Sequence, residues 1–228
     1  MQSTIRAVSK TAIVIGATGL VGQHLVEQLA RATHIQRVVT ITRRAAASPS
    51  AAVTNHVVDF DGLGDYAPLF AGDYLFSCLG TTRKQAGSID AQRKVDLEYQ
   101  FTAARLAAAN GVEHYLLVSS AGADVSSNNP YLKMKGELEQ RVLQLPIARI
   151  SIFQPSVLMG ARAQTRAPEQ LAGLALGSLR WIPGLRRYRP IRGEQVAEKM
   201  MQVSAAPGPA REWFRLDEVF PATISRRG

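Results

Sequence analysis

A length of 228 residues, with 46% hydrophobic and 20% charged residues, is typical of one compact globular unit. No apolar run approaches the roughly 20 residues that a membrane-spanning helix needs, so we expect a soluble protein without membrane contact. The single cysteine, Cys78, excludes a disulfide framework and a multi-cysteine metal site, and it fits a reducing compartment, which we expect to be the cytoplasm.

Short apolar runs alternate with helical stretches, a pattern typical of repeated βαβ units and an α/β fold with a parallel sheet. Strands are predicted at residues 11–16, 37–42, 55–60, 73–80, 114–120, 147–153 and 212–219. Helices are predicted at residues 20–31, 89–110, 130–143 and 194–205. Asn129 and Pro130 support the third helix, because asparagine is a common N-cap and proline a common first helical residue. We expect one domain over residues 1–228.

Three glycines follow the first predicted strand, in the run Gly16-Ala17-Thr18-Gly19-Leu20-Val21-Gly22. Glycine permits a tight turn and a close approach of backbone amides to a diphosphate, and the start of the next helix favours anionic oxygens. The spacing differs from the usual G-x-G-x-x-G fingerprint and by itself also fits a plain strand-to-helix turn. Its place between a strand and a helix favours a dinucleotide site.

The second predicted strand ends at Thr42 and is followed by Arg43 and Arg44. NAD-binding proteins usually carry an acidic residue here, which binds the ribose 2'-hydroxyl. Two guanidinium groups can instead bind a 2'-phosphate through charge-assisted hydrogen bonds. The sequence therefore favours NADP(H) over NAD(H); the alternative is two arginines on a solvated loop.

Two residues of the third predicted helix, Tyr131 and Lys135, are four positions apart and so share one face. A free tyrosine has a pKa of about 10, and a neighbouring lysine stabilises the phenolate and brings proton transfer nearer neutral pH. Lys133 points away and is predicted to be a surface charge. The spacing is common by chance, and its position after the fifth strand gives it weight.

Ser119 and Ser120 close the fifth predicted strand, at the sheet edge where ligands of such folds bind. The hydroxyl of Ser120 would orient a substrate carbonyl while Tyr131 donates a proton. Ser119 is the competing candidate, because strand ends are predicted only to within a residue or two. Alternatively, either serine only bonds backbone at the strand end.

The regular alternation loosens over residues 156–192, which are rich in Gly, Pro and Arg, and we expect a small substrate-covering lobe here. Within it, residues 171–185 also fit a helix on a membrane surface, but a lid over the pocket needs fewer assumptions. Five arginines between residues 180 and 192 favour a solvated face or a rim for an anionic ligand. No zinc spacing, RNA-binding motif or leucine heptad accompanies them, so no nucleic-acid partner is expected.

With these motifs the chain resembles a short-chain dehydrogenase/reductase of the atypical, extended-like branch. It is most similar to the small NAD(P)H-binding oxidoreductases related to the Tat-interacting protein of 30 kDa. The similarity covers nearly the whole chain, and its motifs are GATGLVG at 16–22, CLGTTRKQAGS at 78–88, LLVSSAGAD at 116–124, YLKMKGELE at 131–139 and FQPSVLMG at 153–160. It implies a Rossmann-type doubly wound sheet, NADP(H) binding, and a site at Ser120, Tyr131 and Lys135 with Ser119 in reserve.

The resemblance also implies further cofactor contacts. Asp59 and Phe60 would lie by the adenine. The turn over the cofactor would be formed by Cys78, Leu79, Gly80 and Thr81. The nicotinamide would be bounded by Pro155, Ser156, Val157 and Leu158.

These observations predict an enzyme that transfers hydride between the nicotinamide of NADP(H) and a carbonyl or alcohol carbon of a small molecule. Arg83 and Lys84 would fit an anionic substrate, although a solvated loop also explains them. The alternative is a regulatory protein that binds NADP(H) without turnover and contacts a protein partner through its basic C-terminal third. The four histidines show no paired spacing, so no metal site is expected.

Overall fold

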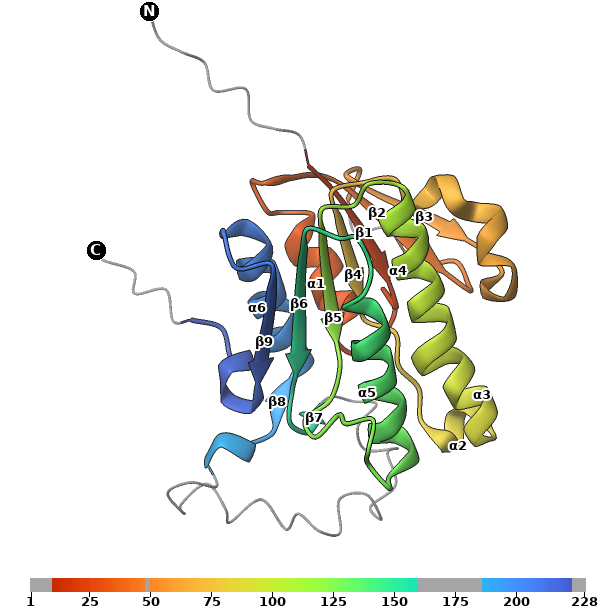
Figure 1. Cartoon of the computed structure of the whole chain (residues 1–228). Coiled ribbons are helices and arrows are strands. Elements are labelled where there is room, and N and C mark those ends of the chain that lie inside the picture. Colours follow the sequence, from red (N-terminus) through yellow and green to blue (C-terminus); the bar gives the residue numbers. More distant parts are fainter. Residues whose placement is uncertain (1–9, 48–49, 160–185, 223–228) are drawn as a thin grey trace, which may run out of the picture.

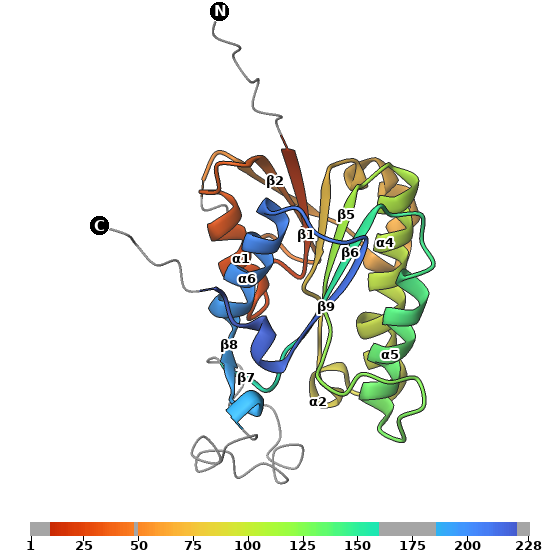
Figure 2. The ribbon, with the colours of Figure 1, turned by 60° about the vertical axis from the view of Figure 1, so that its left-hand side comes forward.

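The computed structural model of the chain describes residues 10–47, 50–159 and 186–222. Within these residues, seven parallel strands form one sheet in the order β3-β2-β1-β4-β5-β6-β9. Helices α1 and α6 cover one face of the sheet and α4 and α5 the other, as Figures 1 and 2 show. The predicted α/β, Rossmann-type doubly wound fold is confirmed.

The elements have the following bounds. The sheet contains β1 (Lys10–Ile15), β2 (Ile35–Thr42), β3 (Val53–Val57), β4 (Tyr74–Ser77), β5 (His114–Val118), β6 (Arg149–Gln154) and β9 (Arg211–Arg215). A separate pair is formed by β7 (Leu158–Met159) and β8 (Ile191–Arg192). The helices are α1 (Gly22–Leu29), α2 (Arg83–Ala86), α3 (Ile89–Arg93), α4 (Tyr99–Ala109), α5 (Pro130–Val142) and α6 (Gly193–Ala205). In the described residues the 3₁₀ segments are η1 (Phe60–Phe70), η6 (Arg186–Tyr188) and η7 (Leu216–Val219), and η2 (Lys94–Glu98) is a π-helical turn.

The core lies on both faces of the sheet. Ile13 and Ile15 of β1 pack in the layer that contains side chains of η1, α4 and α5. Ala12 and Val14, which point to the opposite face, pack with side chains of α1 and α6. All four are fully buried, because helices cover both faces of a parallel sheet. This explains why the strand reads as an unbroken apolar run.

The predicted helix over residues 89–110 is interrupted by the π-helical turn η2. At this turn the buried Gln100 donates from Nε2 to the carbonyl of Asp96 at 2.9 Å and accepts from Ser77 Oγ at 2.8 Å. Polar side chains buried among apolar neighbours thus anchor the wider turn. The hydrophobic spacing of the sequence carries no signal for it, because π turns are single-turn insertions inside otherwise α-helical segments.

Several predicted strands have different bounds in the structure: the fourth covers 74–77 instead of 73–80, and the fifth covers 114–118 instead of 114–120. The third runs over 53–57 instead of 55–60, because Asp59 accepts a hydrogen bond from the amide of Asp61 and begins η1. The last strand stops at Arg215 instead of 219. Leu216 there has a left-handed backbone conformation, with φ of 53°, which breaks the extended chain.

Much of the predicted substrate-covering lobe, residues 160–185, lies outside the described residues, as does the apolar stretch 171–185. The described residues on either side of this segment pair with each other, since Leu158 of β7 pairs with Ile191 of β8. In the described part of the chain no helix is both long enough and apolar enough to cross a membrane.

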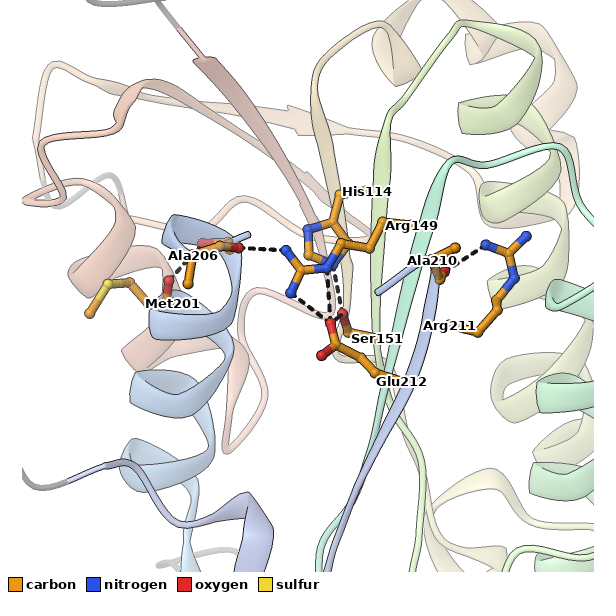
Figure 3. Close-up of polar contacts among 9 residues, drawn as sticks. His114, Arg149, Ser151, Met201, Ala206, Ala210, Arg211 and Glu212 are labelled. Atoms are coloured by element: carbon orange, nitrogen blue, oxygen red, sulfur yellow. Dashed lines mark hydrogen bonds and ion pairs between the residues drawn. The ribbon is translucent and has the colours of Figure 1, made fainter. Parts of the chain in front are cut away.

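A buried polar cluster ties β5, β6 and β9 together at the amino-terminal edge of the sheet (Figure 3). Oε1 of Glu212 accepts from Arg149, at 2.9 Å from Nε and 2.7 Å from Nη2, and from Ser151 Oγ at 2.6 Å. Ser151 Oγ lies 2.7 Å from Nε2 of His114. Since the Ser151 proton goes to Glu212, His114 donates from Nε2 to Ser151 Oγ.

Replacing His114 with glutamine is expected to make stability less sensitive to acid. Burial, followed by the charge of Arg149, lowers the pKa of His114 from 6.5 to about 3. As the pH falls from 6.5 towards 3, the unfolded chain binds a proton that the folded chain excludes, so stability is progressively lost. Urea unfolding at about pH 7 and about pH 4.5 should show a larger loss in the unmodified protein than in His114→Gln, and equal losses would contradict this role.

Candidate active site

The parallel sheet brings the predicted site segments to one edge. Each follows the carboxyl end of a strand: Gly16 after β1, Arg43 after β2, Asp59 near β3, Cys78 after β4, Ser119 after β5 and Pro155 after β6. The first turn of α5, which carries Tyr131, reaches the same edge (Figure 1). The strand order reverses between β1 and β4, and such a switch point is where ligands bind in open α/β sheets.

The glycine turn between β1 and α1 requires glycine at two positions. Gly16 has a φ of +77°, and a Cβ there would lie 2.4 Å from the carbonyl carbon of Cys78. A Cβ at Gly22 would lie 2.2 Å from the carbonyl oxygen of Gly16. The turn therefore packs closely against the β4 loop, and any side chain would force the two apart.

The start of α1 fits the diphosphate of a dinucleotide. No side chain caps this helix, and its first turn contains no acidic residue. The amide groups and the positive end of the helix dipole are thus left for an anionic ligand. Thr18 is exposed beside them, and Gly19, Leu20 and Val21 complete the turn.

The loop after β2 is held in place by β3. Thr42 Oγ1 donates to the carbonyl of Arg44 at 2.7 Å, and Asn55 Nδ2 donates to Thr42 Oγ1 at 2.9 Å. Asn55 Oδ1 accepts from the amide of Ala46 at 3.1 Å. Arg43 and Arg44 are exposed on this loop, and neither forms an ion pair with a carboxylate of the described residues. Two guanidinium groups are therefore available at the edge.

The two residues expected near the adenine differ in exposure. Asp59 is exposed and caps η1. The side chain of Phe60 is buried, with its ring centroid 5.5 Å from that of Tyr99. Its ring therefore belongs to the core.

The loop after β4 is fixed at both ends. The amide of Cys78 donates to the carbonyl of Ile15 at 3.0 Å, which extends the β1–β4 pairing towards the glycine turn. The amide of Thr81 donates to Oδ2 of Asp96 at 3.1 Å. Desolvation raises the pKa of the Cys78 thiol to about 12, so the thiol stays protonated at neutral pH. Leu79 packs on the core, and Gly80, which lies between Leu79 and Thr81, is exposed.

The expected start of α5 is present. Asn129 Oδ1 accepts from the amides of Tyr131 and Leu132, at 2.9 Å and 3.3 Å, and Pro130 is the first helical residue. Tyr131 is partly exposed in the first turn, whereas Lys135 one turn later is buried. Lys133 is exposed, as predicted.

The buried lysine has a partner that the sequence interpretation missed. Nζ of Lys135 lies 3.2 Å from Oδ1 of Asp96, and their side chains are 3% and 0% exposed. Asp96 thus binds Lys135 with one oxygen and the amide of Thr81 with the other. No local signal singled out Asp96, which stands among other charged residues in the segment Lys94–Glu98.

The ion pair decides the charge of Lys135. Burial by itself lowers the pKa of its ammonium group. Attraction to the carboxylate of Asp96 raises it, with contributions from Tyr131 and Glu139, and the pKa lies above its ordinary value. Lys135 therefore remains a cation at neutral pH although it is buried.

The two serines after β5 differ in their contacts. Ser119 is 5% exposed and its hydroxyl donates to the buried carboxylate of Glu139, which the sequence interpretation also missed. Ser120 is partly exposed, and the contact described for its hydroxyl is a long one, 3.5 Å to the carbonyl of Ala121. Ser120 is therefore the serine that a ligand can reach. The signal for Glu139 was its place one turn beyond Lys135 on the same face.

The segment after β6 is covered by the returning chain. The carbonyl of Pro155 accepts from the amide of Ala121 at 3.0 Å. Ser156 Oγ donates to the carbonyl of Arg189, and the carbonyl of Val157 accepts from the amide of Ile191 at 3.0 Å. The predicted nicotinamide segment therefore lies against residues 189–191.

Comparison with known proteins shows the family to which the chain belongs. Residues 16–145 match the NAD(P)H-binding family. The chain is 39% identical over 190 residues to the protein HTATIP2 of Rattus norvegicus, covering 81% of this chain and 78% of the rat protein. It is 38% identical over 156 residues to the mitochondrial protein FMP52 of Candida glabrata, covering 67% of this chain and 66% of that protein.

Solved structures support the fold. MoeE5 in complex with UDP-glucose and NAD has a TM-score of 0.67 at 15% identity, over 92% of this chain and 79% of that one. The Bordetella bronchiseptica enzyme WbmH in complex with NAD+ has a TM-score of 0.68 at 12% identity, over 91% and 75%. At these identities the likeness is one of fold.

The predicted cytoplasmic location is wrong by this comparison. The similar FMP52 proteins of Candida glabrata, Scheffersomyces stipitis and Emericella nidulans are all named mitochondrial. A lone cysteine indicates a reducing environment, but it does not distinguish one reducing compartment from another.

Proposed function

The chain belongs to the NAD(P)H-binding family, and on that premise we propose that it is an NADP(H)-dependent oxidoreductase acting on a carbonyl or alcohol substrate. The observation that carries the proposal is the buried ion pair of Lys135 with Asp96, one helical turn from the partly exposed Tyr131. A buried, permanently charged lysine beside a tyrosine at a ligand-binding edge is suited to proton transfer.

Each residue has a role in this proposal. A nicotinamide cofactor, when bound, would supply or accept the hydride. Tyr131 donates a proton to the substrate oxygen in reduction and accepts it in oxidation. Ser120, whose hydroxyl is accessible, holds that oxygen within reach of the phenol.

Lys135 and Asp96 make the proton transfer favourable. When Tyr131 gives up its proton, the ammonium of Lys135 stabilises the phenolate that remains. A lysine this deeply buried would lose its charge without a counter-ion, and Asp96 provides one. Asp96 also binds the amide of Thr81, so the ion pair is tied to the loop proposed to lie over the cofactor.

The preference for NADP(H) is proposed from Arg43 and Arg44. Arg43→Ala combined with Arg44→Ala is expected to weaken NADPH binding much more than NADH binding, since only NADPH carries the 2'-phosphate. Each charge-assisted contact is worth about 1.5–3 kcal/mol, or roughly tenfold or more in affinity. Fluorescence titration with both cofactors measures the difference between the NADPH and NADH affinities.

Arg37→Ala is the matched control, because Arg37 is an exposed arginine near the other end of β2. It should leave both affinities nearly unchanged. Equal affinity of the unmodified protein for NADPH and NADH would contradict the proposed preference.

The oxidoreductase proposal is tested by mixing the full chain and NADPH with a panel of aldehydes, ketones and quinones. Substrate-dependent oxidation of NADPH supports the enzyme. Tight NADPH binding without turnover across the panel favours the regulatory alternative.

A further inference from the structure

A second buried polar group lies behind the proposed active site and has no part in the chemistry described so far. Glu139 of α5 is 8% exposed, one helical turn beyond Lys135. Its Oε1 accepts from the hydroxyl of Ser119, which follows β5. Both of its oxygens accept from Nε2 of Gln154, the last residue of β6, at 2.9 Å and 3.0 Å. One carboxylate thus binds α5 to the ends of two strands.

The hydrogen bonds of this cluster converge on Glu139. Nε of Arg215, at the end of β9, donates to Oε1 of Gln154 at 3.2 Å. This bond fixes the orientation of the Gln154 amide, so that its NH₂ group faces Glu139. A side chain at position 139 must therefore accept hydrogen bonds from both Ser119 and Gln154. Glutamate meets this requirement, whereas glutamine would turn an NH₂ group towards another NH₂ group.

A buried carboxylate is an expensive choice for a purely structural contact. Burial raises the pKa of Glu139, and its hydrogen bonds offset part of that rise. Charged groups are rarely buried unless they are paired or fully hydrogen-bonded. The contacts that Glu139 makes should therefore explain why a carboxylate is buried at this position.

The groups that Glu139 holds adjoin the proposed site residues. Ser119 precedes Ser120, and Gln154 precedes Pro155. The amide of Ser119 donates to the carbonyl of Phe153 at 2.7 Å, and the amide of Ala121 donates to the carbonyl of Pro155. Ser120 therefore lies between two backbone hydrogen bonds that join the segment after β5 to the end of β6.

We propose that Glu139 is a positioning residue that clamps the ends of β5 and β6 to α5 and so sets the place of Ser120 relative to Tyr131. The inference rests on the proposed function for its effect on catalysis. Misplacement of a reacting group by about 1 Å can lower a rate on the order of 100-fold. Its partners Ser119 and Gln154 lie outside the diphosphate turn at residues 16–22, so binding of the diphosphate should depend on the clamp little.

The test compares Glu139→Gln with the exchange variant Glu139→Gln/Gln154→Glu in the full chain. In the exchange variant, residue 154 accepts from Arg215 and from residue 139, and residue 139 still accepts from Ser119, so each of these three contacts again joins a donor to an acceptor. Glu139→Gln should lower kcat by about tenfold or more, with an NADPH dissociation constant within about threefold of the unmodified protein. The exchange should restore kcat to within about threefold.

Glu137→Gln is the matched control, since it removes the same charge from the same helix at a position paired with Arg93 near the surface. It should leave kcat unchanged. Unchanged kcat in Glu139→Gln, or an exchange variant that is inactive or unfolded, would overturn the inference. If Glu139→Gln alone is too unstable to assay, a folded and active Glu139→Gln/Gln154→Glu variant supports the inference.

Amide hydrogen exchange over residues 119–121 with NADPH bound separates this inference from the proposed function. The clamp predicts that these amides exchange their hydrogens faster in Glu139→Gln than in the unmodified protein. In Glu139→Gln/Gln154→Glu the rates should equal those of the unmodified protein, whether or not a substrate exists. If no carbonyl is turned over, the proposed function fails, and these exchange rates alone decide whether Glu139 positions the strand end.

Discussion

Tyr131→Phe is expected to remove turnover of every carbonyl substrate while leaving NADPH affinity within about threefold of the unmodified protein. A positioned general acid contributes typically about 10²–10⁴-fold to a rate, and phenylalanine keeps the ring but has no proton to give. Tyr131 is partly exposed, so losing its hydroxyl leaves no buried group without a partner and the fold should be preserved.

Turnover of the best substrate from the panel and titration with NADPH measure this effect. Tyr74→Phe is the control, because Tyr74 begins β4 at the opposite edge of the sheet. It should retain full turnover. Activity that persisted in Tyr131→Phe would show that another group, or water, supplies the proton.

Lys135→Met is expected to destabilise the protein by about 3–5 kcal/mol as well as to remove turnover. The substitution would leave the carboxylate of Asp96, which is 0% exposed, without its counter-charge, and breaking a buried pair by removing one partner carries a cost of that size. The double variant Lys135→Met/Asp96→Asn removes both charges and keeps an acceptor for the amide of Thr81. It should recover most of the stability but no turnover.

Lys133→Met is the matched comparison, since it deletes one positive charge from an exposed position of the same helix. It should change the free energy of unfolding by less than about 0.5 kcal/mol. Urea unfolding and turnover assays of the three variants separate the effects. Matching unfolding curves and matching turnover for Lys133→Met and Lys135→Met would refute the buried pair with Asp96.

Several features of this protein could be predicted from local sequence. The glycine turn at residues 16–22 was recognisable because glycine alone tolerates the close approach and positive φ found at Gly16. The start of α5 was predictable because Asn129 and Pro130 act on the adjacent backbone. The pairing of Tyr131 with Lys135 on one face followed from helical periodicity. In each case the interacting residues are close in sequence.

Tertiary structure decided which of these residues are buried, charged and accessible. Asp96 meets Lys135, and Glu139 meets Ser119 and Gln154, only because η2, α5 and the strand ends pack against one another. That packing separates Ser119, whose hydroxyl is engaged, from Ser120, which stays accessible, and no local pattern distinguishes two adjacent serines. The sequence by itself determined the elements and the chemistry they carry, since propensity, capping and periodicity act over a few residues. The electrostatic state of the site depends on desolvation and on partners distant in the chain, so only the packed fold determines it.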